Sequence, residues 1–452
     1  MRKAMGLAVA SLALAGTAMA AAPELKLPVA VKQLGNGLTV VVSKDHSTPT
    51  FGISVVYKVG FRLEPKGRTG FAHLFEHMMF QGTPNTEKGL FSRIIQGGGG
   101  IDNGSTRYDF TNYIASAPVS ALEPILWLES DRMRMLDFSP ANLKNQQDVV
   151  KEEIRVNVLN RPYGLFFWTD VAGLAFDKWE NAHDGYGSFK DLDAANVTDV
   201  AAFHRTYYAP NNAVIGIAGD VKAEEVFALV ERLFGSIPAQ PTPPRPDVSE
   251  KLNTAERSAR QTDQFAQLPA LAVGYKVLDP ASPDWVATAV LGELLFNGEA
   301  SRFYQRFVKT DQTVLQISGG LGWPLADAWS LNGPGMLGML AIYKPSTDAT
   351  KLLAGIQEEI DGIAKKGVPA ADLERVKTKM LSDFYSSVEA LISRADVLAQ
   401  RQAFTGDAAS ANLIPARIAA VKPADLQRAA AAYLTVANRT WVDRQPAPKA
   451  GK

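Results

Sequence analysis

Two histidines and one glutamate stand close together near residue 75, in a pattern suited to metal chemistry. His73, Glu76 and His77 lie in the mainly apolar segment 70–83. On a helix, residues i and i+4 lie one above the other, so the two imidazoles can converge on one ion. Glu76 lies on the same side and can reach a water molecule on that ion. Zinc suits such nitrogen and carboxylate ligands, and a catalytic zinc keeps one position open for water.

This pattern predicts hydrolytic chemistry. A bound zinc ion would lower the pKa of its water and polarise a carbonyl group, and Glu76 would transfer the proton. A single histidine in a helix is readily explained as a core residue satisfied by hydrogen bonds. Three polar groups in so apolar a stretch all need partners, which favours the metal site.

Segment 70–83 resembles the inverted zinc motif H-x-x-E-H of the inverzincin metalloproteases, the family of pitrilysin, insulin-degrading enzyme and the mitochondrial processing peptidase. The resemblance covers nearly all of the chain after residue 20 and is weaker in the second half. Beyond the motif it rests on four sets of residues, which are 59–64, 103–106, Asp109 with Thr111 and Tyr113, and 208–212 with Gly219 and Asp220.

The resemblance implies a third metal ligand. The family uses a glutamate on a second helix, and Glu153 stands 76 residues beyond His77, where that ligand is expected. Glu152 lies about 100° away on a helix and is expected to face elsewhere. Seven residues before the ligand the family often has another glutamate, whereas this chain has Gln146, so the electrostatic surroundings of the metal are expected to differ.

The resemblance also implies where a substrate binds. Family members bind peptides as an extended strand added to a sheet edge, through backbone hydrogen bonds. Asn103, Gly104, Ser105 and Thr106 would occupy that edge. The same glycine- and asparagine-rich stretch also fits an ordinary turn before a strand.

Two halves of the chain repeat one pattern. A strand-like segment ending in Tyr-Lys-Val precedes a helical segment at 55–82 and again at 273–298. We therefore predict an α+β fold of two duplicated, homologous α/β-sandwich domains, which the resemblance makes one half of a pitrilysin-like clamshell. In the second copy the positions of the three motif residues hold Ala289, Gly292 and Glu293, so that copy is expected to lack the metal.

The chain divides by composition into four parts. Residues 1–20 have a basic start, an apolar run and a final Ala-Met-Ala, as in a secretory signal peptide, so we expect export to the periplasm, with the cell exterior as the alternative. Residues 21–236 form the predicted zinc-binding domain and 257–452 its metal-free homologue. The proline-rich segment 237–256 is the predicted linker, although a surface loop would also fit.

Composition excludes several other functions. The chain has 47 basic and 47 acidic residues, which gives no reason to expect a nucleic acid partner. It has no cysteine, so thiolate metal sites, cysteine nucleophiles and disulfides are excluded. After the first twenty residues no apolar run is long enough to predict a membrane span.

One expected feature of the family is missing. Family members use an Arg and a Tyr from the second half to stabilise the tetrahedral intermediate, and here Val308 and Leu315 stand at those positions. We expect a heterodimer in which a homologous, zinc-free subunit supplies that pair. A weak or inactive enzyme is one alternative, since loss of such a donor costs roughly 10²–10³ in rate. A homodimer that uses Arg302 or Arg306 is another.

The leading hypothesis is therefore a zinc-dependent endopeptidase or oligopeptidase with one zinc per chain, which encloses short or unfolded peptides in a chamber. A non-catalytic peptide-binding or assembly subunit of the same fold, like the respiratory-complex core proteins, is the first alternative. A metal-dependent hydrolase of another class is the second.

Overall fold

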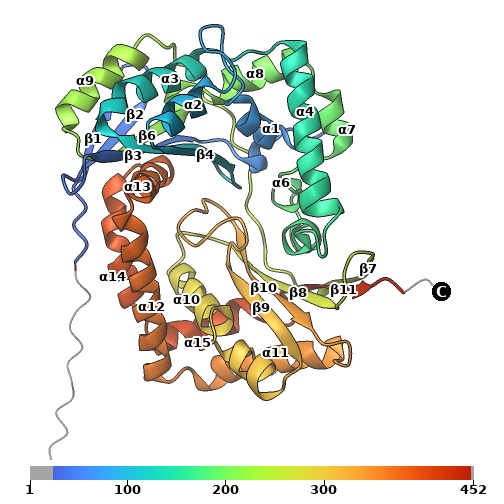
Figure 1. Ribbon diagram of the computed structural model, residues 1–452. Helices are drawn as coiled ribbons and strands as arrows, with labels where there is room; N and C mark the ends of the chain where they lie inside the picture. Colours follow the sequence, from blue (N-terminus) through green and yellow to red (C-terminus); the bar gives the residue numbers. More distant parts are fainter. Residues whose placement is uncertain (1–23, 449–452) are drawn as a thin grey trace, which may run out of the picture.

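The computed structural model describes residues 24–448, and the predicted signal peptide lies outside that range. The first half of the chain is built on a mixed sheet of six strands in the order β1-β2-β6-β3-β5-β4 (Figure 1). Its strands are β1 Ala30–Gln33, β2 Thr39–Lys44, β3 Thr50–Tyr57, β4 Ile101–Thr106, β5 Thr111–Pro118 and β6 Ala213–Gly219.

The second half repeats this sheet. Five strands stand in the order β7-β11-β8-β10-β9, and they are β7 Arg257–Asp263, β8 Ala270–Val277, β9 Val314–Leu321, β10 Gly335–Tyr343 and β11 Arg439–Pro446. In each sheet one parallel pair, β2 with β6 or β7 with β11, is followed by three antiparallel pairings. The prediction of two homologous α+β halves is therefore confirmed, with β1 as an additional strand of the first.

Helices cover both sheets. Those of the first half are α1 Phe71–Met78, α2 Leu90–Gly97, α3 Leu122–Arg134, α4 Pro140–Ile154, α5 Ala172–Ala175, α6 Trp179–Ala182, α7 Phe189–Ala194, α8 Val197–Tyr207 and α9 Ala223–Phe234. Those of the second half are α10 Asp284–Phe296, α11 Ala349–Lys366, α12 Ala370–Glu389, α13 Leu391–Thr405, α14 Ile414–Ala419 and α15 Pro423–Tyr433. Within the described residues, no helix is both long and apolar enough to cross a membrane.

The two halves exchange elements across their boundary. Helix α13 belongs to the second half by sequence, yet it packs against β3 and β6 of the first sheet (Figure 1). Its Leu398 and Ala399 join a buried cluster with Val41 and Val214. In return, the π-helical turn Phe167–Val171 of the first half packs on β8 and β11 of the second. Each sheet is thus completed by a segment from the other half, which ties the halves together.

A buried ion pair adds a second tie. Arg62 is 1% exposed, and its Nη1 lies 2.9 Å from both carboxylate oxygens of Asp109. Its Nη2 donates to the carbonyl oxygen of Pro334 in the second half, and Asp109 accepts the backbone N–H of Asn332 at 2.8 Å. Breaking such a buried pair leaves an uncompensated charge, which is costly. The loop between β9 and β10 is therefore held against the first half.

The proline-rich segment contains no helix or strand, and it is also held in place. The amide of Asn211 donates to the carbonyl of Gln240 at 2.7 Å. Further along, the carboxylate of Glu250 is fully buried 3.1 Å from Nζ of Lys276. The segment is therefore anchored to both halves, although most of its residues are exposed.

The close approach of α13 to the first sheet predicts a steric effect at Gly216 in β6. A Cβ atom there would lie 2.2 Å from the carbonyl oxygen of Ala395. We expect Gly216→Ala to lower the free energy of unfolding by about 1–3 kcal/mol, because the helix must shift. The matched control is Gly362→Ala in α11, where nothing lies within 4 Å and the added helix propensity should stabilise by up to about 1 kcal/mol. Urea unfolding measures both, and an unchanged midpoint for Gly216→Ala would contradict this packing.

Candidate metal centre

The structure brings the three predicted metal ligands together. His73 and His77 project from α1, and Glu153 projects from the last turn of α4 beside it. The Nε2 atoms of the two histidines are 3.3 Å apart. Oε2 of Glu153 lies 3.5 Å from Nε2 of His73 and 3.2 Å from Nε2 of His77. Among residues 24–448 this is the group of three metal-binding side chains that converges.

The spacing of these three atoms fits one zinc ion. A tetrahedral zinc with ligands at about 2.0–2.2 Å requires its ligand atoms to be about 3.3–3.6 Å apart. Two of the observed separations, 3.3 and 3.5 Å, lie in that range, and the third, 3.2 Å, is just below it. The side chain of Glu153 is 31% exposed and that of His77 is 21% exposed, so the cluster is open on one side. Three protein ligands with one accessible side is the arrangement of a catalytic zinc site.

Helix α1 is fixed at its N-terminus by a buried carboxylate. Glu64 accepts the backbone N–H groups of Gly70 at 2.9 Å and Ala72 at 2.8 Å. A negative charge is favourable there because the helix dipole and the unpaired N–H groups point toward it. His183 Nε2 lies 3.3 Å from the same carboxylate. Burial raises the pKa of Glu64, although the bonds from His183 and the backbone act in the opposite direction.

The charges at the cluster favour a cation. Hydrogen bonds from His73 and His77 hold the pKa of the Glu153 carboxyl far below its usual range. Burial opposes protonation of His73, but Glu153, Glu76 and Glu64 together raise its pKa above the usual value. A carboxylate that strongly attracts protons onto the imidazoles would also attract a metal ion, which competes with those protons.

Two side chains that the sequence analysis missed support the ligands. Asn157 follows Glu153 in the π-helical turn Arg155–Leu159, and its Nδ2 donates to Oε1 of Glu153 at 3.5 Å. The ring of Tyr186 meets the ring of His73 edge-on, with centroids 5.2 Å apart. A π-helical turn beside a ligand is a frequent feature of functional sites, but nothing in the sequence pattern identifies it.

The loop that carries Tyr186 is built into the base of α1. Asp184 accepts the backbone N–H groups of Tyr186 and Gly187, each at 3.0 Å. Gly187 has φ +81°, and a Cβ atom there would lie 2.4 Å from the carbonyl oxygen of Thr69. This contact requires glycine and places Tyr186 beside the metal ligands.

Gln146 stands where the family often has a glutamate, and its side chain is neutral. It is buried, and its amide donates to Asn145 at 2.8 Å. Within the described residues, Nδ1 of His73 is buried without a hydrogen-bond partner. Histidine ligands usually donate this second N–H to a carboxylate or carbonyl, which fixes their tautomer. The surroundings of this ligand therefore differ from the usual arrangement.

Glu76 lies between α1 and the edge of the first sheet. Thr106 Oγ1 donates to Oε2 of Glu76 at 2.7 Å. A Cβ atom on Gly104 would lie 3.0 Å from Cγ of Glu76, so the absence of a side chain there lets the strand approach the helix. Asn103, Gly104, Ser105 and Thr106 all lie in β4, the edge strand, which pairs only with β5. The structure thus contains the strand rather than the alternative turn.

The second half has no arginine at the position where the family has one, and the two arginines nearby, Arg302 and Arg306, are paired with acidic residues. Val308 lies in the π-helical turn Tyr304–Thr310 and Leu315 is 47% exposed on β9. Arg302 pairs with Asp372. Arg306 pairs with two glutamates of α11, Glu358 and Glu359. A homodimer that used either arginine would first have to break these ion pairs.

The remaining histidines lie away from the metal ligands. His46 pairs with Asp220, and His183 pairs with Glu64. His204 is buried against Tyr208, with its ring stacked on the tyrosine, and burial lowers its pKa to about 4. None of the three joins the cluster.

Two protein-family models match the chain. One is described as "Insulinase (Peptidase family M16)" and matches residues 39–162, which include the three predicted metal ligands and Glu76. The other is described as "Peptidase M16 inactive domain" and matches residues 194–380. Both matches agree with the resemblance found in the sequence, and the second agrees with the lack of metal ligands in the second half.

Known relatives extend these matches. The zinc protease PqqE of Helicobacter pylori is 28% identical over 359 residues, which are 79% of this chain and 79% of that protein. The crystal structure of a protease from Helicobacter pylori superposes with a TM-score of 0.86 at 26% identity, over 93% of this chain and 100% of that one. The periplasmic protease PqqL of Escherichia coli shares the fold with a TM-score of 0.71 at 18% identity, and 94% of this chain corresponds to 48% of that longer one.

The adjacent acidic residues of α4 give a test of the ligand assignment. We expect Glu153→Gln to weaken zinc binding by more than about 100-fold, beyond the cost of losing a supporting hydrogen bond. Glu152→Gln is the matched control, because Glu152 pairs with Arg155 on the surface. Competition with a chromogenic chelator measures both affinities. Equal zinc affinity of Glu153→Gln and wild type would remove Glu153 from the ligand set.

Proposed function

Because the chain belongs to peptidase family M16, we propose that it is a zinc-dependent endopeptidase or oligopeptidase, with Glu76 as the general base. The observation that carries the proposal is the convergence of His73, His77 and Glu153 beside Glu76. Each chain would bind one zinc ion through the three converging side chains.

The chain's own residues would divide the chemistry between them. Zinc, when bound, supplies a polarising charge that makes water more acidic and the substrate carbonyl more electrophilic. Glu76 would accept the proton of the attacking water and then deliver it to the nitrogen of the leaving amine. The hydroxyl of Thr106 would hold the Glu76 carboxylate in position through its hydrogen bond of 2.7 Å.

Substrate binding is proposed at β4. An edge strand presents unpaired N–H and C=O groups, which can pair with an extended peptide. Asn103, Gly104, Ser105 and Thr106 would supply these groups. Of these, Thr106 donates to Glu76, and Gly104 leaves room for the Glu76 side chain. Backbone pairing selects for extended conformation rather than sequence, so short peptides and unfolded segments are the proposed substrates.

A charge-neutral replacement of the base tests this proposal. We expect Glu76→Gln to lower kcat for a quenched fluorescent peptide by about 10²–10⁴, the usual contribution of a general base. Zinc affinity should remain near that of wild type, because Glu76 is not a ligand. Glu87→Gln serves as the control, since Glu87 pairs with Arg93 at the surface. Full peptidase activity with bound zinc in Glu76→Gln would show that the base is another group.

We also propose that a second, homologous and zinc-free subunit completes the site and supplies the Arg and Tyr that stand here as Val308 and Leu315. Two observations support this heterodimer. Arg302 and Arg306 are engaged by acidic partners within the chain. PqqL of Escherichia coli, which shares the fold, is about twice as long as the part matched by this chain. A homodimer remains the alternative arrangement.

Purification with and without the homologous chain tests the heterodimer. We expect the isolated protein to hydrolyse peptides roughly 10²–10³ times more slowly than the complex, which is the usual cost of losing an oxyanion donor. The measurement is kcat of each preparation at equal zinc content. Equal activity of the isolated chain and the complex would rule out a required partner.

The alternative class is a non-catalytic peptide-binding or assembly subunit of the same fold. The match of residues 194–380 to an inactive domain would fit it, but the three converging ligands of the first half favour catalysis. We propose a periplasmic location on the basis of the signal-like residues 1–20.

A further inference from the structure

A cavity of about 660 Å³ lies between the two halves, on the face of the first sheet opposite α1. The first half contributes residues of β4 and β5, and the second half contributes α10, α12, α13 and the loop between β9 and β10. Nothing in the proposed chemistry uses this space. Its volume lies within the range of about 300–1,000 Å³ that ligand-binding pockets occupy.

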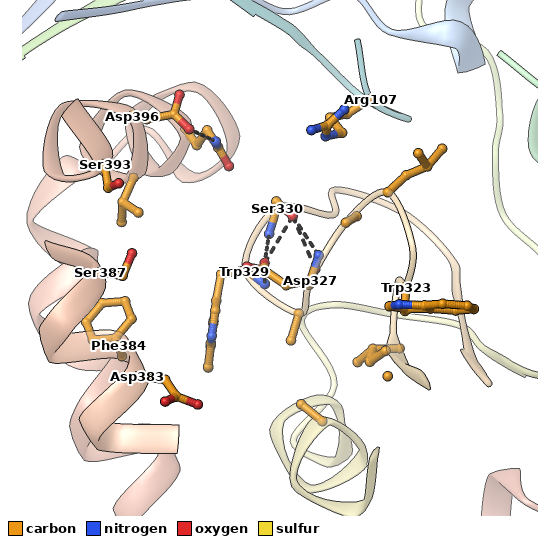
Figure 2. Close-up of a pocket in the computed structure, with 18 of the residues that line it drawn as sticks. Arg107, Trp323, Asp327, Trp329, Ser330, Asp383, Phe384, Ser387, Ser393 and Asp396 are labelled. Atoms are coloured by element: carbon orange, nitrogen blue, oxygen red, sulfur yellow. Dashed lines mark hydrogen bonds between the residues drawn. The ribbon is translucent and has the colours of Figure 1, made fainter. Parts of the chain in front are cut away.

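Aromatic side chains form much of the cavity wall. Figure 2 shows Trp323 and Trp329 projecting from the loop between β9 and β10, and Phe384 facing them from α12. Phe110 and Ile114 line the cavity from the first half. Such a wall favours apolar ligands, because large rings bury much surface at little entropic cost.

The wall carries four acidic residues, Glu293, Asp327, Asp383 and Asp396, and one basic residue, Arg107. Asp383 and Glu293 both pair with Lys379, and Asp327 accepts the backbone N–H groups of its own turn. Arg107 reaches into the cavity from the end of β4 (Figure 2). Within the described residues, no carboxylate lies within ion-pair distance of Arg107, whose Nη1 donates to the carbonyl oxygen of Thr106 at 3.1 Å. Burial raises the pKa of the Asp396 carboxyl, and Arg107 acts on it in the opposite direction. The preference of the cavity therefore follows from its aromatic wall and not from its charges.

The cavity and the metal centre share the same edge strand. Side chains of a strand alternate between the two faces of a sheet. Gly104 and Thr106 face α1, since Thr106 donates to Glu76 and a Cβ atom on Gly104 would lie 3.0 Å from Cγ of Glu76. Ser105, and Arg107 directly after the strand, line the cavity. The neighbouring strand β5 alternates in the same way, since Tyr113 bonds to the backbone of α1 while its neighbours line the cavity.

A peptide added to the free edge of β4 would follow the same alternation. Peptide residues opposite Gly104 and Thr106 would face Glu76 and the metal ligands. The residue between them, and every second residue from it, would face the cavity. The two faces of one bound peptide would thus meet two different environments.

We propose that the cavity is a substrate subsite for large apolar side chains, aromatic ones above all, at alternate positions of the bound peptide beginning next to the cleaved bond. This inference rests on the proposed peptidase function. It assigns the second half a role in specificity, since Trp323, Trp329 and Phe384 all come from that half. The hydrogen bond from Arg62 to Pro334 holds the loop between β9 and β10, which carries both tryptophans, against the first half.

A positional series of quenched peptides tests the subsite. Each peptide carries Phe, Ala or Lys at one position around the cleaved bond. The measurement is kcat/KM, with the isolated chain if it is active and otherwise with its complex with the homologous subunit. At every second position, the cavity-facing ones, we expect kcat/KM for the Phe peptide to exceed that for the Ala peptide by about 10- to 100-fold, with the Lys peptide lowest. At the positions between them, which face Glu76, kcat/KM should not follow this ranking.

Two variants from opposite walls locate the preference. Trp329→Ala removes an aromatic wall, and Ser387→Trp fills the space from an exposed position on α12 that should not affect folding. Each should reduce the ratio of Phe to Ala peptides about tenfold at the cavity-facing positions alone. Trp127→Ala is the matched control, because Trp127 is 41% exposed on α3 and does not line the cavity. Its ratio should equal that of wild type.

The outcomes separate the subsite from the peptidase function. The subsite would be overturned if the preference for Phe did not alternate along the peptide, or if both variants left that preference unchanged. Either result would leave the peptidase function standing. If Trp329→Ala unfolds, Ser387→Trp alone decides. Absence of hydrolysis of every peptide, with and without the partner, would overturn the proposed function and the subsite with it.

Discussion

The candidate site depends on one buried carboxylate that holds the start of a helix. Glu64 has almost no exposed surface, and two backbone N–H groups of α1 together with His183 offset part of the desolvation of its charge. These contacts set the position of α1, and with it the directions of His73, Glu76 and His77. The third ligand, on α4, and the edge strand β4 both pack against α1. The position of α1 therefore determines the distances among the ligands, Glu76 and the edge strand.

The first sheet uses its two faces for different purposes. One face carries α1 and the metal ligands, and the other carries α13 and the cavity walls from the second half. Strand β4 belongs to both, because its pleat sends Gly104 and Thr106 to the first face and Ser105, with Arg107 directly after the strand, to the second. The exchange of segments between the halves fixes this arrangement, since neither sheet is completely covered by its own half.

The sequence predicts the local chemistry better than the long-range packing. The i, i+4 spacing of His73 and His77 is a property of one helix, so it could be recognised from the residues. Glu153 required the resemblance, because no local pattern brings α4 beside α1. The repeated Tyr-Lys-Val segments predicted the duplication, which the two matching sheet topologies confirm.

The structural roles of other residues at the site could not be predicted from the sequence, even for Glu64, which lies in the segment 59–64 that carries the resemblance. Glu64 acts on backbone N–H groups six and eight residues away, and Tyr186 is positioned by glycine contacts between two loops. The docking of α13 on the opposite half was also hidden, since its buried face combines small, aliphatic and charged side chains in Ala395, Leu398, Ala399 and Arg394. Such features depend on which surfaces meet after folding, and no pattern within one segment encodes them.

The central claim is that His73, His77 and Glu153 bind one divalent ion and leave a fourth position to water. Anomalous diffraction at the zinc edge, from crystals grown with excess zinc, tests it most directly. The account predicts one peak about 2.0–2.2 Å from Nε2 of both histidines and from a carboxylate oxygen of Glu153. Well-ordered crystals with no peak among these three side chains would contradict it.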